Sequence, residues 1–249
     1  MDQQNIEQSR AAANQGISAI KDGRNDEASQ LFNSALGYAD DIVNDRARRD
    51  ELSALAALFD MCGFPDLGVM AAQEAVDLDR TLALDSLTAQ DLLEVGNAQM
   101  ALGNKIEAGK CFREALDTFL RREEYANAAS ANTNLSGIFA DDGDMLKARA
   151  MLKTSLEYLK KAPFDNTEMQ TRLGLLQIME FTNDDLEESM ANARELCSRF
   201  FRSMDPQRKD ATRQFVARLG KRYKAAHPKT STTTWMAKNF PALSRKARS

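Results

Sequence analysis

The sequence predicts an all-α protein, a right-handed superhelical solenoid of antiparallel helical hairpins that ends in a C-terminal capping helix. Glycines recur every 40 residues, at Gly23, Gly63, Gly103 and Gly143. Small and aromatic residues recur at the same interval around them, and apolar residues in each copy have helical spacing. Because a simple antiparallel bundle has no reason to repeat at a fixed interval, the period favours a stack of equivalent hairpins.

The recurring positions alternate between small and bulky residues. The first set of equivalent positions holds a small residue in each copy, at Gly16, Ala56, Gly96 and Ser136. The second set holds an alanine or a glycine, at Ala28, Gly68, Ala108 and Ala148. A third set is led by aromatic residues, at Phe32, Ala72, Phe112 and Leu152. A fifth copy follows with Gly174, Leu186, Met190 and Ala193, but it has Phe181 in place of the turn glycine.

One copy, residues 89–121, shows the physical logic of the repeat. Gly103 permits the left-handed backbone that ends a helix, and Asn104 is a residue type that caps the next one. The following apolar residues form a single buried stripe, at Ile106, Ala108, Phe112, Ala115, Leu116 and Phe119. The small Gly96 and Ala108 let the two helices approach closely, and we expect Phe112 to fill the space between neighbouring hairpins.

This order of small residue, glycine, alanine, aromatic residue and alanine resembles the tetratricopeptide repeat family over about residues 9–200. The family's usual period is about 34 residues. The longer period here resembles long-helix variants found in some scaffold and motor-cargo adaptors. The resemblance implies a protein-interaction scaffold or adaptor that binds a partner segment in its concave groove.

We expect five hairpins over residues 1–204, at about 3–42, 46–83, 86–121, 125–161 and 166–203. A capping helix should follow at 205–226, because Asp205 and Pro206 form a cap and first turn. Its apolar stripe comprises Ala211, Phe215, Val216, Leu219 and Tyr223. The remainder, 227–249, is a basic tail, in which His227-Pro228 and the hydroxyl-rich run 229–234 should stop the helix and form a linker.

Charge is distributed unevenly along the chain. Residues 1–210 hold 23 basic and 37 acidic side chains, a net charge of −14, whereas residues 211–249 hold ten basic and no acidic ones. We predict that Trp235, Phe240 and Leu243 hold the tail by apolar contacts, on the array or on a partner. Lys238, Arg245, Lys246 and Arg248 would add attraction to the acidic body. A passive terminus, nucleic acid and an anionic surface remain alternatives for the tail.

Catalysis, metals and cofactors have no support in the sequence. The only histidine, His227, lies in the tail, and no phosphate-binding glycine motif occurs. The acidic run 141–144 fits helix capping better than calcium binding. The three cysteines have no metal or disulfide spacing, so we expect reduced thiols. Since neither a leader nor an apolar run of about 18 residues is present, we expect a cytoplasmic protein without a membrane span.

The family's carboxylate-binding members use lysine, asparagine and arginine on three successive first helices. In the first three repeats these places hold Ala13, Ile17, Ala54, Gln90 and Glu94, so the carboxylate clamp is absent there. In repeats three to five they hold Leu93, Asn97, Asn134, Glu168 and Arg172. We therefore predict that Asn97, Asn134 and Arg172 contact a partner peptide, although exposed polar side chains without that role fit too. A nucleic-acid-associated regulator that uses the tail is the alternative function, and the oligomeric state is open.

Overall fold

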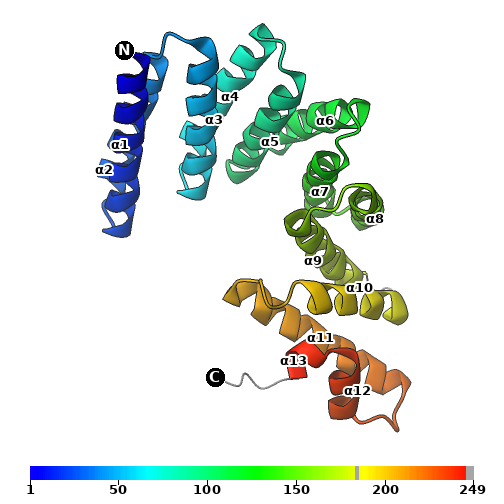
Figure 1. The fold of residues 1–249 in the computed structure, drawn as a ribbon. Coiled ribbons are helices and arrows are strands. Elements are labelled where there is room, and N and C mark those ends of the chain that lie inside the picture. Colours follow the sequence, from blue (N-terminus) through cyan, green and yellow to red (C-terminus); the bar gives the residue numbers. More distant parts are fainter. Residues whose placement is uncertain (183–184, 245–249) are drawn as a thin grey trace. The chain divides into compact units, whose positions relative to one another are not determined.

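The computed structural model describes residues 1–182 and 185–244. Every regular element in these residues is an α-helix, so the all-α prediction is confirmed (Figure 1). The first ten helices are α1 (Asp2–Lys21), α2 (Asn25–Asp40), α3 (Asp45–Met61), α4 (Pro65–Thr81), α5 (Asp85–Ala101), α6 (Lys105–Arg121), α7 (Tyr125–Asp141), α8 (Met145–Lys161), α9 (Asp165–Phe181) and α10 (Leu186–Arg199). Three more follow, α11 (Pro206–Ala226), α12 (Thr232–Asn239) and α13 (Pro241–Ser244).

The structural period is 20 residues, half of the interval visible in the sequence. Helices α3 to α9 each contain 17 residues, and each begins 20 residues after the one before. The turn glycines have positive φ as predicted, between 75° and 85°. Ala83 and Glu123 occupy the corresponding place between hairpins, with φ of 54° and 57°. The turns that follow α3 to α7, both within and between hairpins, therefore share one backbone conformation.

Matching hydrogen bonds close these turns. After α3, the Gly63 amide donates to the Asp60 carbonyl and the Phe64 amide to the Phe59 carbonyl. After α4, the Ala83 amide donates to the Arg80 carbonyl at 3.2 Å. This is the Schellman pattern, in which one residue takes a left-handed conformation. An alanine can occupy that position, but at an energetic cost that glycine avoids.

The predicted side-chain cap at Asn104 is wrong. Asn104 does lie immediately before α6, but its side chain accepts no hydrogen bond from the helix. Its amide group instead donates to Gln99 Oε1 at 2.8 Å, back on α5. The backbone turn has already satisfied the end of α5, so the side chain crosslinks the hairpin rather than capping the helix.

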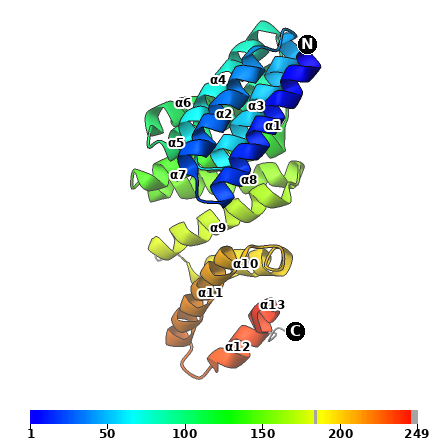
Figure 2. The same ribbon diagram turned by 90° about the vertical axis from the view of Figure 1, so that its left-hand side faces the viewer.

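The chain divides into two compact units, Met1–Asn134 and Leu135–Ser249. In unit 1, α1 to α6 pack in chain order as antiparallel helices (Figures 1 and 2). The small and aromatic positions meet within each of two hairpins: a Cβ added to Gly16 would lie 2.4 Å from the Phe32 ring, and one added to Gly96 would lie 2.4 Å from the Phe112 ring. Phe112 is only 1% exposed, so its predicted burial is confirmed, although its ring lies on Gly96 of the same hairpin. The prediction that Ile106 belongs to the buried stripe is wrong, because Ile106 is 75% exposed.

Unit 2 has an apolar core that α9, α10 and α11 share with the tail. Its buried members include Met190 and Leu196 of α10, Phe215 and Leu219 of α11, and Trp235 of α12. Asp205 caps α11 as predicted, because its Oδ1 accepts from the Arg208 amide at 2.8 Å. The prediction that Ala211 belongs to the apolar stripe of α11 is wrong, because Ala211 is exposed and the neighbouring Thr212 is buried instead.

The interpretation of residues 229–234 as a linker is wrong. His227 and Pro228 do end α11, but Thr232 begins a new helix, with Ser231 accepting from the Thr234 amide at 3.4 Å. Residues with hydroxyl side chains are unfavourable inside a helix but favourable at its start. The prediction of a linker rested on the first effect alone. The segment is a turn followed by the first residues of α12.

Helices α11 and α12 repeat the hairpin packing in shortened form. A Cβ added to Gly220 would lie 3.0 Å from Trp235 Cζ3. The aromatic residue follows the glycine by 15 positions here and by 16 in the Gly16–Phe32 and Gly96–Phe112 pairs. This spacing makes α12 the second helix of a sixth hairpin. The hairpin is abbreviated, because α12 has 8 residues against 17 in α4, α6 and α8.

Candidate functional site

A groove of about 720 Å³ lies within unit 2, between α8 and α10, with α9 contributing its floor. Both walls are second helices of their hairpins. The apolar lining consists of Leu156, Leu159, Pro163, Leu175, Met179 and Ala191. Leu175 and Met179 are buried, and Ala191 is exposed. The groove therefore offers an apolar floor that an inserted side chain can contact.

The turn between α8 and α9 keeps the 20-residue spacing but departs from the common turn conformation at this groove. Pro163 stands at the position that has positive φ after α3 to α7, and the proline ring holds φ near −65°. Ala162 accordingly leaves α8 in an extended conformation, with φ −139° and ψ 90°. Pro163 itself lines the groove. The altered turn thus places an apolar ring at the groove, where a regular turn would continue the repeat.

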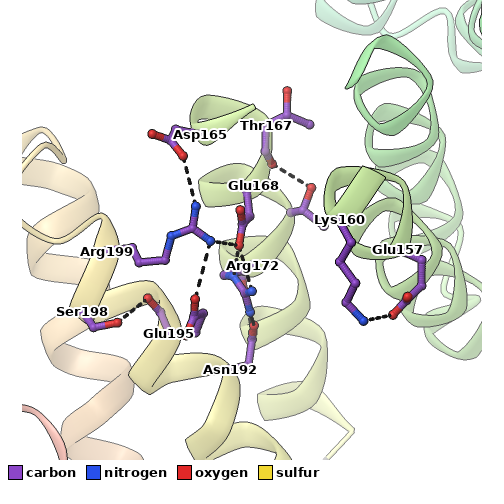
Figure 3. Close-up of polar contacts among 11 residues, drawn as sticks. Glu157, Lys160, Asp165, Thr167, Glu168, Arg172, Asn192, Glu195, Ser198 and Arg199 are labelled. Carbon is purple, nitrogen blue, oxygen red and sulfur yellow. Dashed lines mark hydrogen bonds and ion pairs between the residues drawn. The ribbon is translucent and has the colours of Figure 1, made fainter. Parts of the chain in front are cut away.

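Glu168 of α9 is the most constrained charged residue of the groove. Only 5% exposed, it accepts hydrogen bonds from Arg172 Nε at 2.9 Å and Nη2 at 2.8 Å (Figure 3). Arg199 Nη1 of α10 donates to the same carboxylate at 2.6 Å. Hydrogen bonds between ionised groups are stronger than neutral ones, and a buried carboxylate needs such partners. Glu168 therefore joins α9 to α10.

Arg172 is engaged inside the protein. Its Nη1 donates to Asn192 Oδ1 at 3.0 Å, and Asn192 Nδ2 donates to the Arg172 carbonyl at 3.0 Å. The Arg172 side chain is 17% exposed and that of Arg199 is 38% exposed. Arg199 is thus the arginine of this cluster with more surface open to a partner, although it also pairs with Asp165 at 3.1 Å.

The rim of the groove consists of paired charges. Glu188 accepts from Lys153 Nζ and Arg149 Nη2, both at 2.5 Å, and these contacts, led by the Lys153 hydrogen bond, lower the pKa of Glu188. Lys160 pairs with Glu157 at 2.6 Å (Figure 3). The charges that line the groove balance: the positive charges belong to Lys153, Lys160, Arg172 and Arg199, and the negative charges to Glu157, Glu168, Glu188 and Glu195. Selection by this groove would depend on shape and paired contacts rather than on net charge.

Two of the three predicted partner-binding residues meet in unit 1. Asn134 Nδ2 of α7 donates to Asn97 Oδ1 of α5 at 2.9 Å. Asn97 also hydrogen-bonds Glu94, whose pKa is raised by burial first and by the charge of Asp60 second. Arg172 belongs to unit 2, where it contacts Glu168 and Asn192. A shared role for all three residues stays a prediction.

The tail residues singled out in the sequence lie in the core of unit 2. Trp235 is 3% and Phe240 1% exposed, and their ring centroids are 5.3 Å apart. Leu243 is partly buried beside them, and Tyr223 of α11 stacks on Trp235 at 5.3 Å. The predicted basic partners Arg245, Lys246 and Arg248 lie outside the described residues.

Within residues 1–182 and 185–244, no three His, Cys, Asp or Glu side chains are arranged to hold a metal ion. Asp144 instead accepts from the Lys147 amide at 3.0 Å, the capping role expected for the acidic run. In the same described part of the chain, no helix combines the length and apolar character that a membrane crossing requires. Cys197 is buried, which raises the pKa of its thiol to about 12, and Cys62 and Cys111 are partly exposed.

Sequence reasoning singled out Arg172, which lines the groove, but it missed the groove itself and the roles of Glu168 and Arg199. The repeat columns report packing inside hairpins, whereas the groove lies between two second helices. Pro163 was the available signal, because a proline at a turn position that elsewhere has positive φ indicates a changed connection.

Solved structures with a similar fold agree with this architecture. No protein-family model and no curated protein sequence matches the chain. Among solved structures, a Podosopora anserina putative kinesin light chain with nearly identical TPR-like repeats is 13% identical, with a TM-score of 0.55, and the alignment covers 76% of this chain and 93% of that one. BtubC (BKLC) from P. vanneervenii is 18% identical, with a TM-score of 0.55 and coverage of 92% and 91%.

A third similar structure is a Rap protein complexed with Competence and Sporulation Factor. It is 15% identical, with a TM-score of 0.57, and the alignment covers 95% of this chain and 71% of that one. At these identities the likeness concerns the fold alone. Together with the repeated hairpins, it shows that this chain has the fold of a tetratricopeptide-like helical repeat array.

Proposed function

We propose that the chain is a protein-interaction module that holds a segment of a partner protein in the groove between α8 and α10. The observation that carries the proposal is the groove itself, with a floor of Leu175 and Met179 and a rim of paired charges. Apolar pockets with a few fixed polar groups are the usual form of a binding site. The solved Rap complex, which has a similar fold, is consistent with this role. The proposal assigns no catalytic step to the chain.

Filling the groove tests the proposal without removing a native contact. Ala191 lines the groove on α10 and is exposed, so Ala191→Arg adds volume where the partner would lie. Ala217 on α11 is exposed and does not line the groove, so Ala217→Arg is the matched control. Peptides are selected from a random display library on the wild-type chain, and their affinities for the variants are measured by calorimetry.

We expect Ala191→Arg to weaken the selected peptides at least tenfold, which corresponds to about 1.4 kcal/mol of binding free energy. Ala217→Arg should leave their affinity unchanged. Equal affinity for wild type and Ala191→Arg would place the peptide elsewhere and contradict the proposed site. A library that yields no binding peptide would contradict the proposed function itself.

The asparagine pair in unit 1 has a proposed role of its own. Asn97 and Asn134 can pair with the backbone of an extended peptide through their amide groups. Asn97→Ala, measured with the same peptides, tests this contact separately from the groove. A loss confined to Asn97→Ala would assign binding to unit 1, and an unchanged affinity would remove Asn97 from the binding surface.

The alternative function, a regulator that binds nucleic acid through the tail, has less support. Arg218 forms a bidentate pair with Glu180, and Arg213 lies over the Phe201 ring with its guanidinium carbon 5.2 Å from the centroid. Part of the basic charge near the C-terminus therefore serves internal contacts. Phosphate binding would show a steep loss of affinity with salt, and a salt-independent partner would exclude it.

A further inference from the structure

A buried ionic cluster joins the second and third hairpins of unit 1. Arg49 of α3 donates to Asp79 of α4 through Nε at 2.7 Å and Nη2 at 3.2 Å. The same Nη2 donates to Asp91 Oδ2 of α5 at 2.7 Å, and the Ser53 hydroxyl donates to Asp91 Oδ1 at 2.6 Å. Arg49, Asp79 and Asp91 are 6%, 0% and 2% exposed. One guanidinium thus holds three helices through two buried carboxyl groups.

The charges of this cluster do not balance when both carboxyl groups are ionised. Asp79 and Asp91 then carry two negative charges against the single positive charge of Arg49. Asp50, on α3, also contacts Arg49 Nη1 at 3.2 Å, but its side chain is 54% exposed and solvated. Among the described residues, the ion pairs of the two buried carboxyl groups are those with Arg49. An uncompensated charge in a buried site is costly, and uptake of a proton removes it.

We propose that the junction of α3, α4 and α5 is a pH-responsive clasp. It is closed by a proton held between Asp79 and Asp91, and it weakens when a rise in pH removes that proton. Asp91 is the group that takes the proton. Burial, opposed by the Ser53 hydrogen bond and by Arg49, raises its pKa to about 7, and the hydrogen bond with Asp79 acts in the same direction as burial. The clasp therefore responds within the range of pH found in cells.

The sign of the response follows from the two states of Asp91. In the closed junction the carboxyl group keeps its proton up to about pH 7, whereas in an opened junction it ionises near its ordinary value of 3.8. Opening therefore releases a proton between these limits, and its equilibrium constant rises by up to about tenfold per pH unit. Stability of the junction is greatest at low pH, falls as pH rises and becomes constant above about pH 7.

Native-state hydrogen exchange on the full chain measures this opening. Exchange rates of the α4 and α5 amides, corrected for intrinsic rates, should show an opening constant that increases up to about 100-fold between pH 5 and pH 7. Asp91→Asn replaces the protonated acid by a neutral amide that does not titrate; its oxygen can accept from Arg49, and its NH2 group can donate to the Ser53 hydroxyl or to Asp79. The increase should therefore disappear. Asp50→Asn is the matched control, because it alters an exposed partner of the same guanidinium and should retain the increase.

A wild-type opening constant that does not change with pH would overturn the proposal. An increase that persists in Asp91→Asn would also overturn it, because another group would then be responsible. Carbon-detected NMR titration of the wild-type chain provides a measurement that needs no variant. The Asp91 carboxyl carbon should titrate with a midpoint between about pH 6 and 8, and a midpoint near 4 would show that no proton is held.

Discussion

Trp235 of α12 packs against Gly220 of α11 so closely that an added Cβ would lie 3.0 Å from the indole Cζ3. The same relationship joins Phe112 to Gly96 in the third hairpin. The Trp235 indole is 3% exposed, and it contacts the aromatic rings of Tyr223 and Phe240. The small-residue rule of the repeat therefore continues into α12, whose first residues, 232–234, belong to the run that the sequence had indicated as a linker.

Replacing Gly220 by leucine should detach α12 from α11. The added side chain would occupy the space of the Trp235 ring, and overpacking of this kind costs about 1–3 kcal/mol. We expect the tryptophan fluorescence maximum to shift to longer wavelength, because the indole becomes solvated. Ala217→Leu, at an exposed position three residues earlier on the same helix, should leave the spectrum unchanged. An unshifted spectrum in Gly220→Leu would contradict the packing.

Glycine at position 83 should stabilise the protein. Ala83 has a φ of 54°, a left-handed conformation that costs an L-residue about 1–2 kcal/mol. Glycine removes this cost but is more flexible in the unfolded chain, by about 0.5–1 kcal/mol. We expect Ala83→Gly to raise the free energy of unfolding by about 0.5–1 kcal/mol, measured by urea denaturation. Gly63→Ala, at the equivalent turn with φ 80°, should lower it; effects of equal sign would contradict a shared turn conformation.

Phe112→Ala should destabilise unit 1 strongly. The side chain is 1% exposed and fills the space above Gly96, so its removal leaves a cavity and should cost about 3–5 kcal/mol. Ile106→Ala in the same helix is the control, because Ile106 is 75% exposed and its loss should change stability by less than about 0.5 kcal/mol. Thermal and urea unfolding measure both. Similar losses in the two variants would refute the assignment of the buried face.

Glu168→Gln should loosen the attachment of α10 to α9. The glutamine keeps the shape but removes the charge that faces Arg172 and Arg199, and a hydrogen bond to a charged group is worth about 1.5–3 kcal/mol. Glu157→Gln removes an exposed pair with Lys160 and should cost at most about 0.5 kcal/mol. Hydrogen exchange of the α10 amides, compared between the two variants, measures the difference. Unchanged protection in Glu168→Gln would show that the cluster does not hold α10.

The sequence by itself determined the repeated hairpin. Glycine at the turns, small residues at the helix crossing and Phe32 and Phe112 in the spaces between helices each act through local backbone freedom or residue size. Such constraints leave a period that can be read without a structure. The buried stripe of α11 at Phe215 and Leu219 is local in the same sense, because helical spacing alone specifies it.

Only the tertiary structure decided which residues meet across hairpins. Arg49, Asp79 and Asp91 are separated by 30 and 12 residues, and nothing in their local sequence distinguishes them from solvated charges. Ala83 and Glu123 adopt left-handed turns because the packing of the flanking helices stabilises a conformation that their own preference opposes. The groove at Pro163 and the placement of Trp235 likewise depend on contacts between separate helices, whose energies are absent from any single segment of the chain.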